Sequence, residues 1–154
     1  MGLLLVVNLH GVINSSGPVR KALNELWVAK KFSASVVTDD APTVGMLRLC
    51  KDYVAWSAVS EGLLAELLSK RGMVARERSL DHAALKELGY KTHEDLASKM
   101  VKEQSRLSSV HGVLPYFRLA PPRGGFKLSL RRQYTERGLL GNNPKLEEIV
   151  RRMI

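Results

Sequence analysis

Residues 3–9 read Leu-Leu-Leu-Val-Val-Asn-Leu, an apolar run that is broken only by Asn8. The β-branched side chains of Val6 and Val7 favour a strand. A strand that is apolar at almost every position is typical of one buried within a sheet. His10 and Gly11 end the run. We therefore expect these residues to form a strand in the middle of a sheet.

Two helices and two further strands are predicted after this run. Ser16 precedes Gly-Pro and a series of apolar residues at helical spacing, which predicts a helix with one stripe facing the core. Residues 32–38 predict a second strand and residues 43–51 a second helix. Residues 53–59 are rich in aromatic and β-branched side chains and predict a third strand. The order of these elements is β-α-β-α-β.

The rest of the chain predicts a mostly helical extension. Ser60 is a candidate N-cap for a helix that ends before Gly72. Thr92 has an acid three residues later, as in a capping box, and opens a helix that runs to about Ser105. Shorter elements are expected as helices over 81–88 and from 143 onward, and as strands over 73–78 and 116–119.

The composition indicates a soluble globular protein with an anionic partner. The chain has 154 residues, enough for one domain, with 45% hydrophobic and 25% charged residues. Its 24 Lys and Arg exceed its 15 Asp and Glu and give a net charge of +9. Residues 112–154 hold nine of the cations and three of the acids. Because an excess of positive charge attracts anionic molecules, a polyanion is the first candidate for the binding partner.

The sequence contains none of several common catalytic motifs. Cys50 is the single cysteine, and the four histidines lack the spacing of a zinc site. The sequence has no P-loop, dinucleotide fingerprint or nucleophile elbow. We expect no catalysis, no metal and no cofactor. The first residues lack the cationic leader of a signal peptide and are too few to span a bilayer, so an intracellular protein without a membrane partner is expected.

Four other residues that could carry chemistry are expected to be structural. Asp39 and Asp40 are a conceivable carboxylate pair, but acids in a turn before Pro42 more often cap the next helix. Trp27 and Trp56 fit the apolar stripe or strand of their own elements, which favours a place in the core over a base-stacking platform.

The most informative stretch is the basic segment, residues 116–137. Its guanidinium and ammonium groups match phosphate oxygens, and Gly124 and Gly125 permit close backbone approach. We predict that it contacts the backbone of a folded RNA, against the alternative of a solvated basic loop. The predicted cationic contacts of this segment are Arg118, Arg123, Lys127, Arg131, Arg132 and Arg137.

A second set of cations lies on the outer faces of the first two predicted helices and their ends. Any amphipathic helix needs a polar face, so phosphate contact and simple solvation are equally good interpretations here. The members of this set are Arg20, Lys21, Lys30, Lys31, Arg48 and Lys51.

Three stretches resemble one protein family. They are Val7-Asn8-Leu9-His10-Gly11, Asp40-Ala41-Pro42-Thr43-Val44-Gly45-Met46-Leu47 and Leu119-Ala120-Pro121-Pro122-Arg123-Gly124-Gly125. Together with the total length, they resemble the archaeal form of large-subunit ribosomal protein thirty, the counterpart of eukaryotic ribosomal protein seven. The resemblance covers nearly the whole chain.

The resemblance implies a fold. It is a ferredoxin-like α+β core over residues 1–59, with an antiparallel sheet in the order 3-1-2 and two helices on one face. Residues 60–154 would form the archaeal and eukaryotic type of extension, with an RNA-binding loop at 116–137 and a C-terminal helix.

The resemblance also implies a function. The chain would be a structural constituent of the large subunit in the cytoplasm, bound to large-subunit rRNA beside neighbouring ribosomal proteins. The 5S rRNA would be a candidate partner. The positions that would face RNA are Arg123, Gly124, Gly125, Gly45, Met46 and Arg48.

Two alternatives come from other classes of protein. A ferredoxin-like regulatory module that binds a small molecule could share the order of strands and helices. An enzyme acting on an anionic substrate could share the basic surface, but it would need a base or nucleophile that the sequence does not provide.

Overall fold

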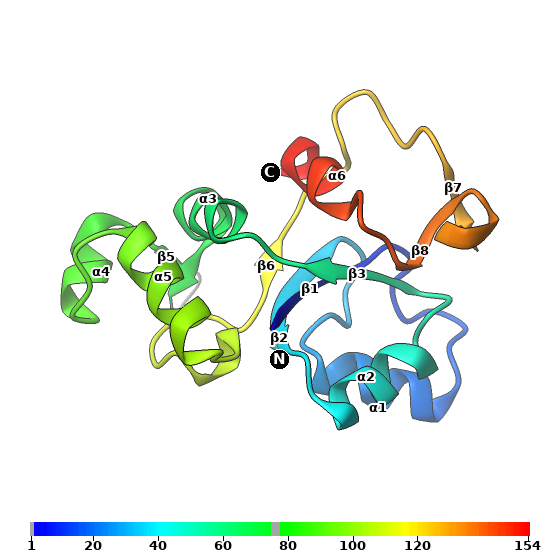
Figure 1. The fold of residues 1–154 in the computed structure, drawn as a ribbon, viewed down its shortest axis with the longest axis horizontal. Helices are drawn as coiled ribbons and strands as arrows, with labels where there is room; N and C mark the ends of the chain where they lie inside the picture. The colour runs from blue at the N-terminus through cyan, green and yellow to red at the C-terminus, as the bar shows by residue number, and fades with distance from the viewer. Residues whose placement is uncertain (1, 75–77) are drawn as a thin grey trace.

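Within residues 2–74 and 78–154, which the computed structural model describes, six strands form one sheet through the middle of the molecule (Figure 1). In spatial order they are β6 (Phe117–Arg118), β2 (Ser33–Thr38), β1 (Leu3–Asn8), β3 (Val54–Ala58), β8 (Gly138–Asn142) and β7 (Ser129–Gln133). Strand β1 pairs antiparallel with both β2 and β3, whereas β8 pairs parallel with β3 and with β7. The sheet is therefore mixed, in an α+β protein.

A three-stranded antiparallel sheet is wrong as a description of the whole sheet. Strand β1 does lie between β2 and β3, but β6 extends one side and β8 and β7 extend the other. The added strands leave weak signals in the sequence. Strand β6 has only two residues, and β8 contains Gly138 and Gly141, which are atypical of a strand interior.

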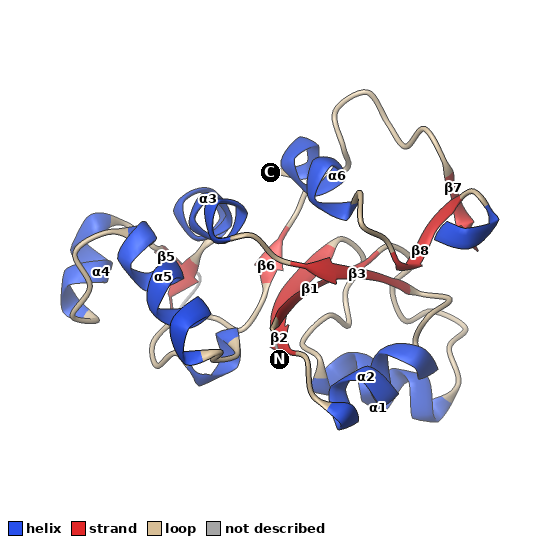
Figure 2. Cartoon of the chain, in the orientation of Figure 1, coloured by secondary structure: helices blue, strands red, loops and turns tan. Residues whose placement is uncertain are grey.

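Both faces of the sheet are covered, which explains the unbroken apolar run in β1. Leu5 and Val7 point into one cluster of buried side chains, and Val6 points into the other. Helices α1 (Gly17–Glu25) and α2 (Ala41–Leu49) pack on the Val6 side. Helices α3 (Glu61–Arg71) and α6 (Leu146–Met153) cover the opposite face (Figure 2).

The extension continues beyond α3 as a small helical unit at one end of the molecule (Figure 1). Helices α4 (His82–Glu87) and α5 (His93–Glu103) form it, with the 3-10 helix η2 (Leu107–Ser109). A two-stranded sheet of β4 (Met73–Val74) and β5 (Arg78–Ser79) replaces the predicted strand over 73–78, of which residues 75–77 lie outside the described residues. No helix in the described part of the chain is both long and apolar enough to cross a membrane.

The predicted helix caps are confirmed at two positions. The hydroxyl of Ser60 accepts a hydrogen bond from the Leu63 N–H (3.3 Å), and that of Thr92 accepts one from the Asp95 N–H (3.1 Å). The C-terminal helix, predicted from residue 143 onward, is also confirmed, and it begins at Leu146 with four apolar side chains buried. They are Leu146, Ile149, Val150 and Met153.

Asn8 joins three parts of the chain through one buried side chain. Its amide nitrogen donates to the Val28 carbonyl (2.7 Å), while its amide oxygen accepts from the backbone N–H groups of His10 (2.9 Å) and Gly11 (2.7 Å). Its backbone carbonyl accepts from the Phe32 N–H (2.7 Å). The end of β1, the loop after it and the connection from α1 to β2 are thus held together.

We expect Asn8→Ala to lower the free energy of unfolding by about 3 kcal/mol, because it leaves buried donors and an acceptor without partners. Urea denaturation monitored by circular dichroism measures the change. Asn142→Ala, at an exposed position of β8, is the control and should change stability by less than about 0.5 kcal/mol. Equal effects of the two substitutions would contradict the role of the buried amide.

Candidate nucleic-acid interface

The basic segment crosses from one edge of the sheet to the other. It begins with β6, passes over α6 and continues through β7 and the 3-10 helix η3 (Tyr134–Glu136), after which the chain enters β8 (Figure 1). In its middle, the Gly125 N–H donates to the Pro122 carbonyl (2.9 Å) and closes a tight turn. Gly124 and Gly125 have φ of +79° and +72°, a region that favours glycine. Open space surrounds both, so the turn needs glycine for its backbone rather than for packing.

Helix α6 anchors this turn. The Arg123 N–H donates to the Arg152 carbonyl (3.0 Å), and the Arg152 guanidinium donates weakly to the carbonyls of Arg123 (3.5 Å) and Gly125 (3.4 Å). The Phe126 ring stacks on Phe32 at 6.0 Å between centroids. The backbone of the turn is therefore positioned by the protein, while the Arg123 side chain is exposed.

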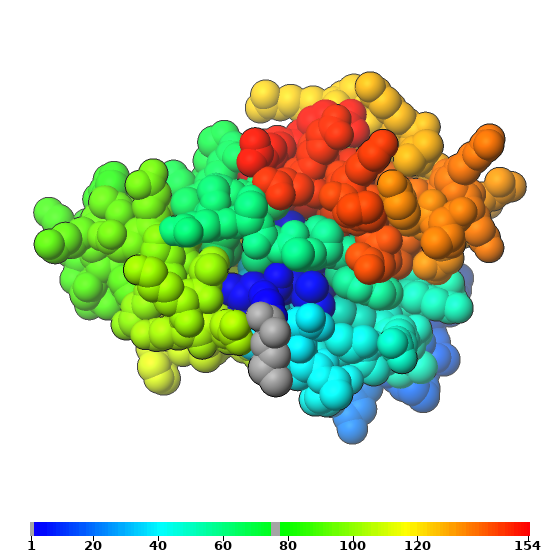
Figure 3. Space-filling view, in the orientation of Figure 1, coloured from blue at the N-terminus to red at the C-terminus, as the bar shows by residue number. Residues whose placement is uncertain are grey.

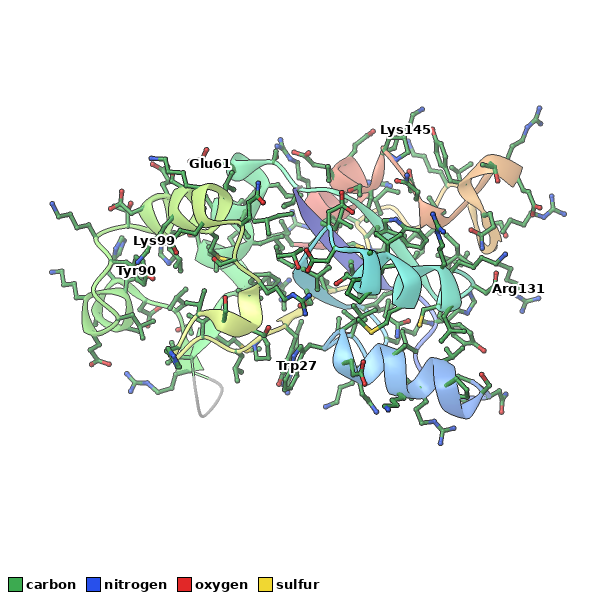
Figure 4. All side chains as sticks on the ribbon, turned by 60° about the horizontal axis from the view of Figure 1, so that its bottom comes forward. Trp27, Glu61, Tyr90, Lys99, Arg131 and Lys145 are labelled. Atoms are coloured by element: carbon green, nitrogen blue, oxygen red, sulfur yellow. The ribbon has the colours of Figure 1, made fainter. Side chains whose placement is uncertain are left out.

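The other end of the basic segment is anchored at the end of the sheet. The Gln133 side-chain amide donates to the Lys51 carbonyl (3.1 Å) and to the Asp52 carboxylate (2.9 Å). A ring nitrogen of His10 lies 2.5 Å from the Leu130 carbonyl oxygen. These contacts bring Arg131 and Arg132 to the same end of the sheet as Lys51. Side chains of this region stand out from the surface (Figure 3), and Arg131 points away from the body (Figure 4).

The structure divides the predicted contact residues into separate groups rather than one patch. All are exposed except Met46, which is half-buried in α2. The predicted residues on the basic segment are Arg118, Arg123, Gly124, Gly125, Lys127, Arg131, Arg132 and Arg137; those on or beside the first two helices are Arg20, Lys21, Lys31, Gly45, Met46, Arg48 and Lys51.

The availability of the cations differs between the groups. Lys21 lies 4.0 Å from the Glu25 carboxylate, and Arg20 donates to the Ser15 carbonyl at 3.5 Å. Among residues 2–74 and 78–154, no ion pair holds Arg123, Arg131 or Arg132. The guanidinium groups of Arg123, Arg131 and Arg132 are therefore exposed and available to neutralise an external anion.

The core position predicted for Trp27 is wrong. Helix α1 ends at Glu25, so Trp27 lies beyond the apolar stripe, and 49% of the residue is exposed. Figure 4 shows it standing out beside the end of the helix. Trp56, on β3, is half-buried against the cluster that contains Val6, in agreement with its prediction. Helical spacing identified Trp27 as a core residue because spacing alone does not show where a helix ends.

The acids at the entry to α2 do not act as predicted. Asp40 occupies the N-cap position, but its carboxylate makes no capping bond. Instead it accepts hydrogen bonds from Thr38 and from the Arg106 guanidinium (2.8 Å), which also binds the hydroxyl groups of Thr38 and Thr43. The Thr38 hydrogen bond, and after it Arg106, lower the pKa of Asp40. The carboxylate thus links the sheet to the extension.

We expect this link to weaken in acid. Since the pKa of Asp40 is lower in the folded than in the unfolded chain, its stabilising effect is present above about pH 4 and is lost as the pH falls through the folded-state pKa. Asp40→Asn should therefore lower the melting temperature at pH 6, by an amount that shrinks progressively as the pH is lowered from about 4 toward about 2. Thermal melts across this range test it, with the exposed Asp39→Asn as control. A constant difference at all pH values would contradict it.

Cys50 and the acidic and histidine side chains are possible catalytic groups among the described residues. Cys50 is fully buried, its thiol lies 3.8 Å from the Val19 carbonyl, and burial raises its pKa to about 11. A thiol of this kind is not a nucleophile at neutral pH. Among the described residues, no group of three or more His, Cys, Asp or Glu side chains is placed to hold a metal ion.

Comparison with known proteins assigns the chain to a family. No protein-family model matches it. It is 35% identical over 153 residues to the large ribosomal subunit protein uL30 of Cenarchaeum symbiosum, with 99% of each chain covered. It is 34% identical to the uL30 protein of Nitrosopumilus maritimus, covering 98% of this chain and 97% of the relative. With that of Thermofilum pendens the identity is 35% over the full length of both.

These relatives are archaeal ribosomal proteins, a class that is structural and not enzymatic. The chain belongs to the uL30 family of large ribosomal subunit proteins. The resemblance noted in the sequence is thereby confirmed, as is the expectation that the protein is not an enzyme. Family membership favours the ribosomal hypothesis over a small-molecule regulatory module.

Proposed function

We propose that this protein is a structural constituent of the large ribosomal subunit in the cytoplasm, where it binds large-subunit rRNA and stabilises its folded form. Full-length similarity to uL30 proteins carries this proposal. The exposed cations of the basic segment, whose backbone is anchored to the rest of the protein, would bind the phosphate groups of the rRNA.

The mechanism is electrostatic and geometric. Exposed guanidinium groups donate forked hydrogen bonds to phosphate oxygens and displace the counterions that surround RNA. Because the segment is tied to α6 at Arg123 and to the α2–β3 turn at Gln133, less backbone freedom is lost on binding. Contacts of this kind orient a protein on RNA without reading its sequence.

We further propose that residues 1–59 correspond to a ferredoxin-like core and residues 60–154 to the extension. This division describes the order of the chain rather than two folding units. The extension contributes β6 to one side of the core sheet and β8 to the other, and α3 and α6 cover one of its faces. The RNA-binding loop at 116–137 therefore begins and ends at the sheet.

Partners beyond large-subunit rRNA belong to the same proposal. The 5S rRNA is a candidate second RNA, since the cations lie on more than one side of the sheet. Neighbouring ribosomal proteins are candidate partners of the surface formed by α3, α4 and α5. A map of the assembled subunit would test both.

We expect the triple variant Arg123→Ala, Arg131→Ala, Arg132→Ala to fold normally but to bind rRNA more weakly. The three side chains are exposed and form no ion pair in the described structure, so the melting temperature should be unchanged. The slope of log K against log salt should be about −3 to −4 for the original protein and smaller in magnitude by about 2 to 3 for the variant. Filter binding to large-subunit rRNA at several salt concentrations measures both.

A matched variant controls for the loss of net charge. Lys86→Ala, Lys91→Ala, Lys102→Ala removes three exposed cations from the α4–α5 unit, away from the basic segment. It should retain nearly the original affinity and slope. Equal weakening by the two triple variants would mean general attraction by net charge and would contradict a specific interface at the basic segment.

A further inference from the structure

A groove lies between the end of α1 and the beginning of β2, beside β6. Its volume is about 610 Å³, within the range of roughly 300–1,000 Å³ that is usual for ligand sites. Trp27 and Tyr116 supply aromatic surface, and Lys30, Lys31 and Arg118 supply positive charge. No Asp or Glu is among the described residues that line it.

Trp27 occupies a position that would suit glycine better. Its N–H donates to the Asn24 carbonyl and the Val28 N–H to the Leu23 carbonyl, both at 3.0 Å, which are the two bonds of a Schellman motif. Trp27 occupies the C′ position of this motif and has a left-handed conformation, with φ of +61°. A large aromatic side chain at this position is both strained and half-exposed, so folding does not explain it.

The surroundings of Trp27 favour an anion that carries a flat apolar surface. In the lining of the groove, the Arg118 guanidinium lies 5.8 Å from the centre of the Tyr116 ring. Aromatic faces beside cations bind single-stranded nucleic acid, because bases stack on the rings while phosphates meet the charges. A paired RNA helix would use the cations alone, since its bases are stacked on each other.

We propose that this groove binds one unpaired nucleotide of RNA, with its base stacked on Trp27 and its phosphates facing Lys30, Lys31 and Arg118. The inference rests on the proposed function, because it needs RNA as the partner. It adds a second mode of binding to the backbone contacts of the basic segment. A base that has left its helix would be fixed at this edge of the protein.

The test compares Trp27→Gly and Trp27→Phe with the original protein in binding to an eight-residue oligoadenylate and to a duplex RNA of the same length. Fluorescence anisotropy of labelled RNA at low salt measures the dissociation constants. Trp27→Gly should weaken oligoadenylate binding by about fivefold or more, the loss expected for one stacked base, and duplex binding by less than about twofold. Trp27→Phe should retain most of the affinity, because a smaller ring still stacks.

Stability separates a lost contact from a damaged fold. Glycine suits the left-handed position, so Trp27→Gly should melt at the same or a higher temperature. Leu49→Ala removes another half-exposed apolar side chain, on α2 and outside the groove, and should leave oligoadenylate binding unchanged. In a Trp56→Phe protein, Trp27 is the only tryptophan, and oligoadenylate should quench its fluorescence.

Unchanged oligoadenylate binding by Trp27→Gly would overturn the inference, and so would equal weakening of single-stranded and duplex binding. If the basic-segment triple variant still lost rRNA affinity in that case, the proposed function would stand without the groove. If the original protein bound no rRNA, both proposals would fail. A map of the subunit showing Trp27 packed on another protein would assign the groove to a protein partner and overturn the inference.

Discussion

The buried side chain of Asn8 is the interaction on which the arrangement of the molecule depends. Its amide satisfies three backbone groups that the sheet leaves unpaired where β1 ends. One of these is the carbonyl of Val28, the residue that follows Trp27. Another is the N–H of His10, whose ring nitrogen contacts the Leu130 carbonyl of the basic segment. A single amide in an apolar strand thus positions the end of α1, the start of β2 and the loop that receives the basic segment.

The two ends of the basic segment are incorporated into the same sheet. Strand β6 pairs with β2 at one edge of the sheet, and β7 pairs with β8 at the other, so the segment is fixed at opposite edges. Helix α6 packs on the sheet and provides the carbonyl and guanidinium groups that hold the turn at Arg123. The apolar core therefore also fixes the positions of Arg123, Arg131 and Arg132, which are exposed and form no ion pair with any residue that the structure describes.

The charge distribution separates the two proposed modes of RNA binding. Exposed arginines at Arg123, Arg131 and Arg132 suit the continuous phosphate backbone of a folded RNA. The groove at Trp27 offers aromatic surface together with charge and suits a base that is not paired. At the α3–α5 end of the molecule, two of the cations have acidic partners, in the Lys70–Glu66 and Lys99–Glu103 pairs.

Local sequence determined the elements whose signals are short in range. The apolar run at 3–9, the caps at Ser60 and Thr92 and the stripe of the last helix follow from periodicity and capping, which act within a few residues. The density of cations in residues 116–137 likewise indicated the class of partner. Tertiary structure alone decided that β8 and β7 extend the sheet beyond β3, that Asp40 binds Arg106 and that Trp27 is half-exposed. The first two depend on hydrogen bonds between segments that are distant in the sequence, and the third depends on where a helix ends. The spacing of neighbouring residues encodes none of these.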